Sequence, residues 1–256
     1  MNKFLWKKPP IPLRISREEC HVWKIDLRAV NKEKFQLDIL SEDEQKRLSS
    51  FKFAKDRFRY GVTHFLKRWV LASYLKEHPE KLIFTLGKYG KPAISSQKNW
   101  PNLQFNISHS NQIILLGVTV EDPIGIDVEY HTDNICIENL REFIFSPLER
   151  SYFSKLVSQQ EKKEAFFRCL TRKEAYLKAK GDGLTDFLTK ISVDMNELPT
   201  DDWLETLTLN KKENLPWKLF PVDVGKSYTA AVVSTHYPKH LIGYTVNGIK
   251  NLTRTN

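Results

Sequence analysis

Two stretches of the chain, 105 residues apart, carry the same signal for the start of a helix. Ser41 is followed three residues later by Glu44, and Ser146 is followed three residues later by Glu149. This spacing is the capping box, in which the serine and the glutamate satisfy backbone groups at the first turn. A long basic helical pattern and several strand-like segments follow each start, so we expect two similar α/β halves.

The order of segments indicates the fold class α/β (α+β), with two halves related by a pseudo-twofold axis and each formed by a small sheet packed by a long helix. We place the halves at residues 1–130 and 131–256. The long helices are predicted over residues 56–77 and 161–180, because a proline closes the first pattern and glycines close the second. Strands are predicted over residues 23–27, 82–86, 103–107, 113–120, 124–130, 191–194, 204–209, 218–222, 228–235 and 241–246.

The net charge of +9 indicates a partner that is anionic. Nucleic acid, a small molecule with several phosphates and an acidic protein each satisfy this condition. The three cysteines stand far apart and are odd in number, so we expect reduced thiols and no disulfide framework. No apolar run reaches the length of a membrane span, and the N-terminus lacks the apolar stretch of a signal peptide, so we expect a cytoplasmic protein.

Two carboxylates, Asp127 and Glu129, lie two residues apart in the segment Gly-Ile-Asp-Val-Glu. Side chains alternate along a strand, so these carboxylates would share one face and repel each other. A hard divalent cation removes that repulsion, and ligands that are all oxygen suit magnesium, which also takes substrate phosphates. Taken alone, such a pair is more typical of a solvated strand face.

Glu174 and Lys178 are four residues apart and would lie one turn from each other on the second long helix. An ordinary surface ion pair is one interpretation. In the functional interpretation, Glu174 is a third carboxylate for the metal or a general base, and the lysine steadies phosphate charge.

Two further segments hold side chains that suit a phosphate. Ser108 and His109 follow the predicted strand over residues 103–107, and Lys91 lies in the turn Tyr-Gly-Lys-Pro. Adjacent strand residues face opposite sides, so the serine and the histidine are not expected to form a hydrolase dyad. A structural histidine and a plain surface turn are the alternatives.

These segments occur in a characteristic order: Gly-Lys-Pro, Phe-Asn-Ile-Ser-His-Ser, Gly-Ile-Asp-Val-Glu, Lys-Glu-Ala-x-x-Lys and Gly-x-Gly-Leu, over residues 59–184. In this order the chain resembles the phosphopantetheinyl transferases of the large, surfactin-synthetase-activating type. The resemblance implies a monomer of two similar halves with the active site at their junction. It implies transfer of the phosphopantetheine moiety of coenzyme A to a serine of an acyl or peptidyl carrier protein, with release of adenosine 3',5'-bisphosphate. Such carrier proteins serve fatty-acid, polyketide or nonribosomal-peptide synthesis.

The resemblance also implies a role for each candidate residue. Asp127, Glu129 and Glu174 would hold magnesium or manganese together with the pyrophosphate of coenzyme A. Glu174 would also be the catalytic base, and Lys178 would contact the phosphates near the transferred bond. The side chains implied to hold the adenosine end are Arg47, Arg68, Lys91, Ser108 and His109. The implied acceptor is an acidic carrier protein, and neither nucleic acid nor a membrane is an implied partner.

Three positions depart from the family's pattern. Leu170 stands where the family usually has tryptophan, Asp182 where the loop often has lysine, and Glu44 at a usually basic position. Two other functions stay open at this point. One is a basic protein that binds nucleic acid through the helix over residues 56–77, and the other is a magnesium-dependent phosphohydrolase acting on a nucleotide.

Overall fold

The structure is a computed structural model, and it describes residues 4–30, 38–95, 100–181, 183, 188–197, 207–208, 217–235 and 240–246. Its α-helices are α1 (Glu42–Ser49), α2 (Ala54–Leu75), α3 (Ile137–Ile144), α4 (Pro147–Phe153) and α5 (Gln159–Lys180). Its strands are β1 (Trp6–Lys7), β2 (Glu19–Asp26), β3 (Phe84–Leu86), β4 (Pro92–Ile94), β5 (Leu103–Ser110), β6 (Ile113–Val120), β7 (Ile124–Tyr130), β8 (Ser192–Val193), β9 (Leu207–Thr208), β10 (Lys218–Pro221), β11 (Tyr228–Ser234) and β12 (His240–Thr245). None of the described helices is both long and apolar enough to cross a membrane.

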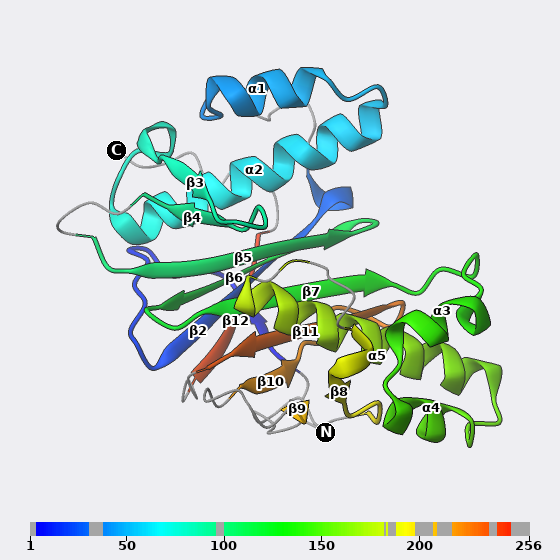
Figure 1. Cartoon of the computed structure of the whole chain (residues 1–256). Helices are drawn as coiled ribbons and strands as arrows, with labels where there is room; N and C mark the ends of the chain where they lie inside the picture. The colour runs from blue at the N-terminus through cyan, green and yellow to red at the C-terminus, as the bar shows by residue number, and fades with distance from the viewer. Residues whose placement is uncertain are drawn as a thin grey trace.

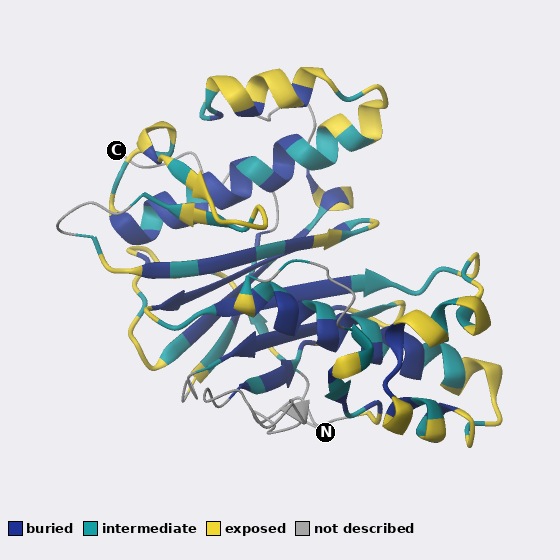
Figure 2. Cartoon of the chain, in the orientation of Figure 1, coloured by how far each residue is buried: buried dark blue, intermediate teal, exposed yellow. Residues whose placement is uncertain are grey.

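Two sheets lie between two long helices (Figure 1). The larger sheet has the strand order β1-β12-β2-β6-β5, and the smaller has the order β10-β11-β7. One apolar cluster fills the space between α2 and the larger sheet, a second lies between the sheets, and a third lies between the smaller sheet and α5. Buried residues follow these layers in Figure 2, and the outer side of α1 is exposed. The mixed α/β class, with a small sheet packed by a long helix in each half, is confirmed.

The two sheets exchange a strand across the predicted boundary between the halves. Strand β12 comes from residues 131–256, yet it lies parallel between β1 and β2 in the larger sheet. Strand β7 comes from residues 1–130, yet it pairs antiparallel with β11 in the smaller sheet. The division into two domains at residue 130 stays a prediction, and any such domains would share strands.

Most predicted elements are present, with small shifts at their ends. The strands over residues 113–120 and 124–130 have the predicted bounds, and both long helices begin two residues before their predicted starts. Residues 204–206 and 209 of one predicted strand lie outside the described residues. Helix α3 was not predicted because Cys136, the residue before it, makes no side-chain cap and so leaves no start signal. Strand β4, only three residues long, was not predicted either.

Both capping boxes are confirmed, and each of their glutamates also accepts a buried ion pair from the following long helix. Glu44 accepts from Lys67 at 2.8 Å and from Arg68 at 2.5 Å, both on α2. Glu149 accepts from Lys173 on α5. The pairs Glu44–Arg68 and Glu149–Lys173 are again separated by 105 residues. The internal repeat therefore places a short capped helix against a long one in each half.

These contacts bear on the nucleic-acid hypothesis, which rested on the basic residues of α2. Lys67 and Arg68 are buried, and Arg59 pairs with Asp56 at 2.7 Å. Because three of the basic side chains of α2 have acidic partners within the fold, the helix does not present them as a free basic face.

We expect Glu149→Ala to destabilise the protein strongly, because it leaves the fully buried ammonium of Lys173 without its carboxylate and removes a capping box. The free energy of unfolding should fall by about 3–5 kcal/mol. Urea unfolding followed by circular dichroism measures this change. The matched control is Asp43→Ala, which removes one partner of an exposed pair with Lys46 and should cost less than about 1 kcal/mol. Similar losses in both variants would contradict the buried pair as the source of stability.

The imidazole of His21, on β2, is also buried. The Nδ1 atom of His21 is 2.6 Å from the hydroxyl of Tyr74, and Trp23 donates to the same hydroxyl at 3.0 Å. His21 is 1% exposed, and burial lowers its pKa from 6.5 to about 4. The imidazole is therefore neutral in the folded protein near pH 6, where an unfolded chain already takes up a proton.

This depressed pKa predicts that His21 makes stability fall as the pH falls from 6.5 toward 4. The loss should approach about 1.4 kcal/mol for each pH unit, since only the unfolded state binds the proton in this range. Unfolding free energies measured between pH 7 and pH 4.5 for the native protein and His21→Gln test this. Other titrations cancel in the difference, so equal slopes in the two proteins would exclude His21 as the cause.

Candidate active site

Strand β7 and helix α5 are in direct backbone contact at a glycine. A Cβ atom on Gly125 would lie 1.9 Å from the carbonyl oxygen of Ala175 and 2.3 Å from the backbone nitrogen of Ala179. Glycine alone leaves room for this approach, because every other residue carries the Cβ. Gly125, Asp127 and Glu129 alternate along β7, so all three share the face that meets α5.

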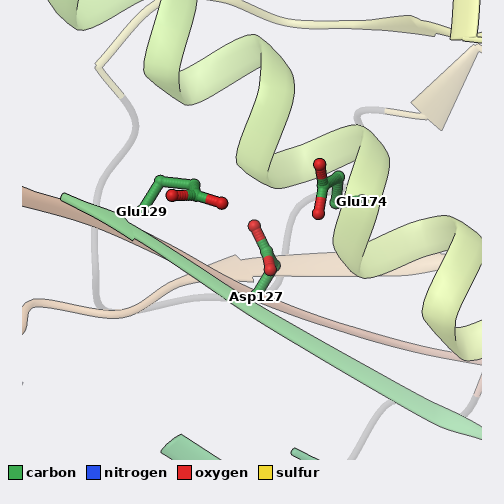
Figure 3. Close-up of side chains that lie close together, drawn as sticks. All are labelled: Asp127, Glu129 and Glu174. Atoms are coloured by element: carbon green, nitrogen blue, oxygen red, sulfur yellow. The ribbon is translucent and has the colours of Figure 1, made fainter. Parts of the chain in front are cut away.

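The three predicted carboxylates meet at this contact (Figure 3). Asp127 and Glu129 come from β7 and Glu174 comes from α5, and one oxygen of each lies within 4.8 Å of the others. Asp127 is fully buried, and the two glutamates are half-buried. A solvated strand face is therefore the wrong interpretation of Asp127, and the two halves contribute jointly to one acidic cluster.

Polar side chains hold two of these carboxylates in place. Ser108 donates to Oδ1 of Asp127 at 2.9 Å, and Ser110 donates to Oε2 of Glu129 at 3.0 Å. The ammonium of Lys178 contacts Oδ1 of Asp127 and lies 3.7 Å from Glu174. Lys178 therefore pairs within the cluster, and its partner is the buried aspartate as well as the glutamate one turn away.

The carboxylates of the cluster lie close together and are partly buried, and both conditions shift their pKa values. Burial, and then the charge of Asp127, raise the pKa of Glu174 to about 7. The same two causes raise the pKa of Glu129. Burial opposes the charged form of Lys178, but the negative charges of Asp127 and Glu174 outweigh it and raise the lysine pKa. Three carboxylates face one ammonium, so the site favours additional positive charge.

The donor set fits magnesium. Oδ2 of Asp127 is buried and has no hydrogen-bond partner among the described residues. Burying a carboxylate oxygen in this way is costly unless a cation or a donor reaches it. All the candidate ligands are oxygens, and no histidine or cysteine belongs to the cluster. This set suits a hard ion such as magnesium or manganese and not a zinc site.

Lys91 and His109 differ in their surroundings. The ammonium of Lys91 donates to the carbonyls of Ile124 and Ala179, both at 3.0 Å, so it ties the start of β7 to the end of α5. Burial lowers its pKa to about 8. His109 is exposed and close to the positive charges of Arg59 on α2 and Lys178 on α5. Ser108 faces Asp127, which agrees with the expectation that it does not form a dyad with the histidine beside it.

The two predicted arginines of the adenosine site differ in their surroundings. Arg47 on α1 is exposed and lies over the ring of Phe51. Arg68 is buried, and its guanidinium donates to Glu44 and to the carbonyls of Pro79 and Leu82. These contacts make Arg68 part of the core and do not favour a contact with coenzyme A.

The positions that depart from the family's pattern have structural settings of their own. Leu170 packs against the apolar cluster under α5. Glu44 is the acceptor of the buried ion pairs of α2, which explains an acid at that position. Asp182 lies outside the described residues.

Two contributors to the site escaped the sequence analysis, Gly125 and Ser110. In the sequence the glycine appears only as the first residue of Gly-Ile-Asp-Val-Glu, and the serine only as the last residue of Phe-Asn-Ile-Ser-His-Ser. The two-residue period of a strand gives the missing signal: residues 106, 108 and 110 share a face, as do residues 125, 127 and 129.

Comparison with known proteins agrees with this geometry. Residues 123–233 match the family model described as the 4'-phosphopantetheinyl transferase superfamily, and residues 29–120 match the one described as 4'-phosphopantetheinyl transferase, N-terminal. The chain is 35% identical over 185 residues to the 4'-phosphopantetheinyl transferase HetI of Nostoc sp., covering 72% of this chain and 78% of that protein.

Two further relatives cover similar shares. The 4'-phosphopantetheinyl transferase Sfp of Bacillus subtilis is 27% identical over 78% of this chain and 84% of its own length. The transferase gsp of Aneurinibacillus migulanus is 26% identical over 76% of each chain. These family matches show that the chain is a transferase enzyme. The chain belongs to the 4'-phosphopantetheinyl transferase superfamily, whose members move the phosphopantetheine group of coenzyme A to carrier proteins.

We expect Gly125→Ala to impair both stability and transfer, because the new methyl group would meet the backbone of α5. Overpacking of this kind should cost about 1–3 kcal/mol. A displacement of Glu174 by about 1 Å should lower kcat/KM by roughly 100-fold. Unfolding curves and a transfer assay measure the two effects.

The matched control is Gly117→Ala on β6. Its Cβ would meet Cδ1 of Ile124, the end of a flexible side chain, at 2.7 Å, and its next neighbours are other side-chain atoms at 3.4 Å and 3.7 Å. It should lose far less activity. Native activity in Gly125→Ala would show that the close approach of α5 to β7 does not determine the geometry of the site.

Proposed function

We propose that this chain is a magnesium-dependent 4'-phosphopantetheinyl transferase whose metal is held by Asp127, Glu129 and Glu174 together with the pyrophosphate of coenzyme A. The observation that supports the proposal is the convergence of three carboxylate oxygens within 4.8 Å, with Oδ2 of Asp127 buried and unpartnered among the described residues. A bound magnesium ion would neutralise charge on the pyrophosphate and on the leaving group.

Glu174 is the proposed base of the reaction. A serine hydroxyl is a poor nucleophile near neutral pH and needs a group to take its proton. As the serine oxygen bonds to the phosphorus next to the pantetheine arm, Glu174 takes the hydroxyl proton and the bond to the bridging oxygen breaks. Adenosine 3',5'-bisphosphate leaves with that oxygen. Burial and the charge of Asp127 raise the pKa of Glu174 to about 7 in the site without a cation, and a bound divalent cation would lower it and favour the ionised form that accepts the proton.

Positive side chains would bind the remaining phosphates. Lys178, which pairs with Asp127, is the proposed contact of the phosphates next to the transferred bond. His109, Lys91 and the exposed Arg47 are the proposed contacts of the adenosine end, and Ser108 is proposed to contact it while holding Asp127. Phosphoryl transfer depends mainly on positioning and on neutralised charge, so a set of this kind supplies what the reaction requires.

The proposed acceptor is an acidic carrier protein. A net charge of +9 would attract it by long-range steering and so raise the rate of encounter. The monomeric state and the cytoplasmic location stay predictions.

Mass spectrometry of an acyl carrier protein incubated with coenzyme A, magnesium and the enzyme tests the proposal. The carrier should gain one phosphopantetheine group on a serine, and chelation of the metal should stop the gain until magnesium is restored. Asp127→Asn should reduce the rate by roughly 100-fold or more because it removes a ligand of the metal. Glu174→Gln should reduce it by roughly 100-fold or more because it removes a ligand and the base together.

Asp43→Asn is the control, because it changes an exposed carboxylate on α1 that is remote from the cluster in sequence and contacts only Lys46 among the described residues. Its rate should equal that of the native enzyme. Full activity in both site variants would refute the proposed metal set, and release of phosphate without a carrier protein would favour a phosphohydrolase.

A further inference from the structure

The two sheets meet at strands β5 and β7, which are edge strands of different sheets and share no backbone ladder among the described pairs. Side chains from alternate residues of β5 connect them instead. Oδ1 of Asn106 accepts from the backbone nitrogen of Ile126 at 2.9 Å, and Ser108 donates to Asp127 at the same distance. Ser110, the next alternate residue, donates to Glu129 and accepts from the backbone nitrogen of Tyr130.

Ser110 makes two contacts that together define its orientation. Its oxygen accepts from the backbone nitrogen of Tyr130 at 3.0 Å, and its hydroxyl donates to Oε2 of Glu129 at 3.0 Å. A hydroxyl has a single proton to donate. Because the backbone group is a donor, that proton is left for the carboxylate. The serine thus fixes the end of β7 and the side chain of Glu129 through one atom.

We propose that Ser110 is a positioning residue for Glu129, which it holds toward Asp127 and Glu174 in readiness for the divalent cation; this inference rests on the metal set proposed above. Without the serine, two forces would move Glu129 away. The nearby charge of Asp127 repels it, since one oxygen of each residue lies within 4.8 Å of the other, and a long glutamate side chain gains rotamer entropy when it is released to solvent.

Asp127 does not depend on Ser110 in this way. Its side chain is short and fully buried, and Ser108 and Lys178 both contact it. Loss of Ser110 should therefore disturb one ligand of the three and leave the base Glu174 in place. The expected signature is weaker binding of the cation with chemistry preserved once the cation is saturating.

Binding of Mn²⁺ by electron paramagnetic resonance, with coenzyme A present and no carrier protein, measures the effect without turnover. Ser110→Ala should weaken Mn²⁺ binding by roughly 10- to 100-fold, the usual result of removing a hydrogen-bond partner of a metal ligand. The magnesium concentration for half-maximal transfer should rise in proportion, and kcat at saturating magnesium should stay within about twofold of the native value, because Glu174 remains in place.

Three further variants make the test specific. Ser110→Thr keeps the hydroxyl and should restore native binding. Ser110→Cys keeps the size of the side chain with a weak donor, and it should weaken binding even if the alanine variant folds poorly. Ser49→Ala, which removes an exposed hydroxyl bonded to the backbone of α1, should bind Mn²⁺ as the native protein does.

A double-mutant cycle with Glu129→Gln separates this inference from the proposed function. If Ser110 acts through Glu129, the alanine change should add little to the loss caused by Glu129→Gln. Native Mn²⁺ affinity in both Ser110→Ala and Ser110→Cys, together with weakened binding in Glu129→Gln, would overturn the positioning role alone. Unchanged binding in Glu129→Gln itself would overturn the metal set and the inference with it.

Discussion

The contact between β7 and α5 at Gly125 is the constraint on which the site depends. The strand carries two acids of the cluster, and the helix carries the third together with Lys178. With a Cβ at residue 125 the helix could not lie on the strand, since its own backbone occupies that position. Lys91 strengthens the same junction by bonding to carbonyls of both elements. The absence of a Cβ at Gly125 therefore lets two segments that are distant in the chain bring their carboxylates into one acidic cluster.

The second connection is polar and joins the two sheets through side chains. Between paired strands, backbone groups satisfy each other, but the edges of β5 and β7 lie in different sheets. Asn106, Ser108 and Ser110 supply the hydrogen bonds that a ladder would otherwise provide. Because two of their partners are the carboxylates of Asp127 and Glu129, the link that joins the sheets also orients the acids. The same few hydrogen bonds thus join the sheets and contact two carboxylates of the cluster.

The internal repeat is explained by buried ion pairs between the short and the long helix of each half. Glu44 and Glu149 each serve first as part of a capping box and then as the partner of a buried cation on the next long helix. A buried arginine or lysine needs such a partner, which is why the repeat preserves the acid together with the base. This pairing removes Arg68 from the surface. The guanidinium that the family resemblance implies for the adenosine end is thus buried in the core beside Glu44.

Local signals in the sequence determined the helix starts at Ser41 and Ser146, the shared face of Asp127 and Glu129, and the mixed α/β class. These features depend on spacings of two to four residues, which helix and strand geometry convert directly into position. Tertiary structure alone decided that Glu174 faces Asp127 and that Ser110 reaches Glu129. It also decided that β7 and β12 each join the sheet formed mainly by the other half of the chain. Those outcomes depend on the contacts between elements far apart in the chain, where a missing Cβ or a buried charge acts only after the elements have packed.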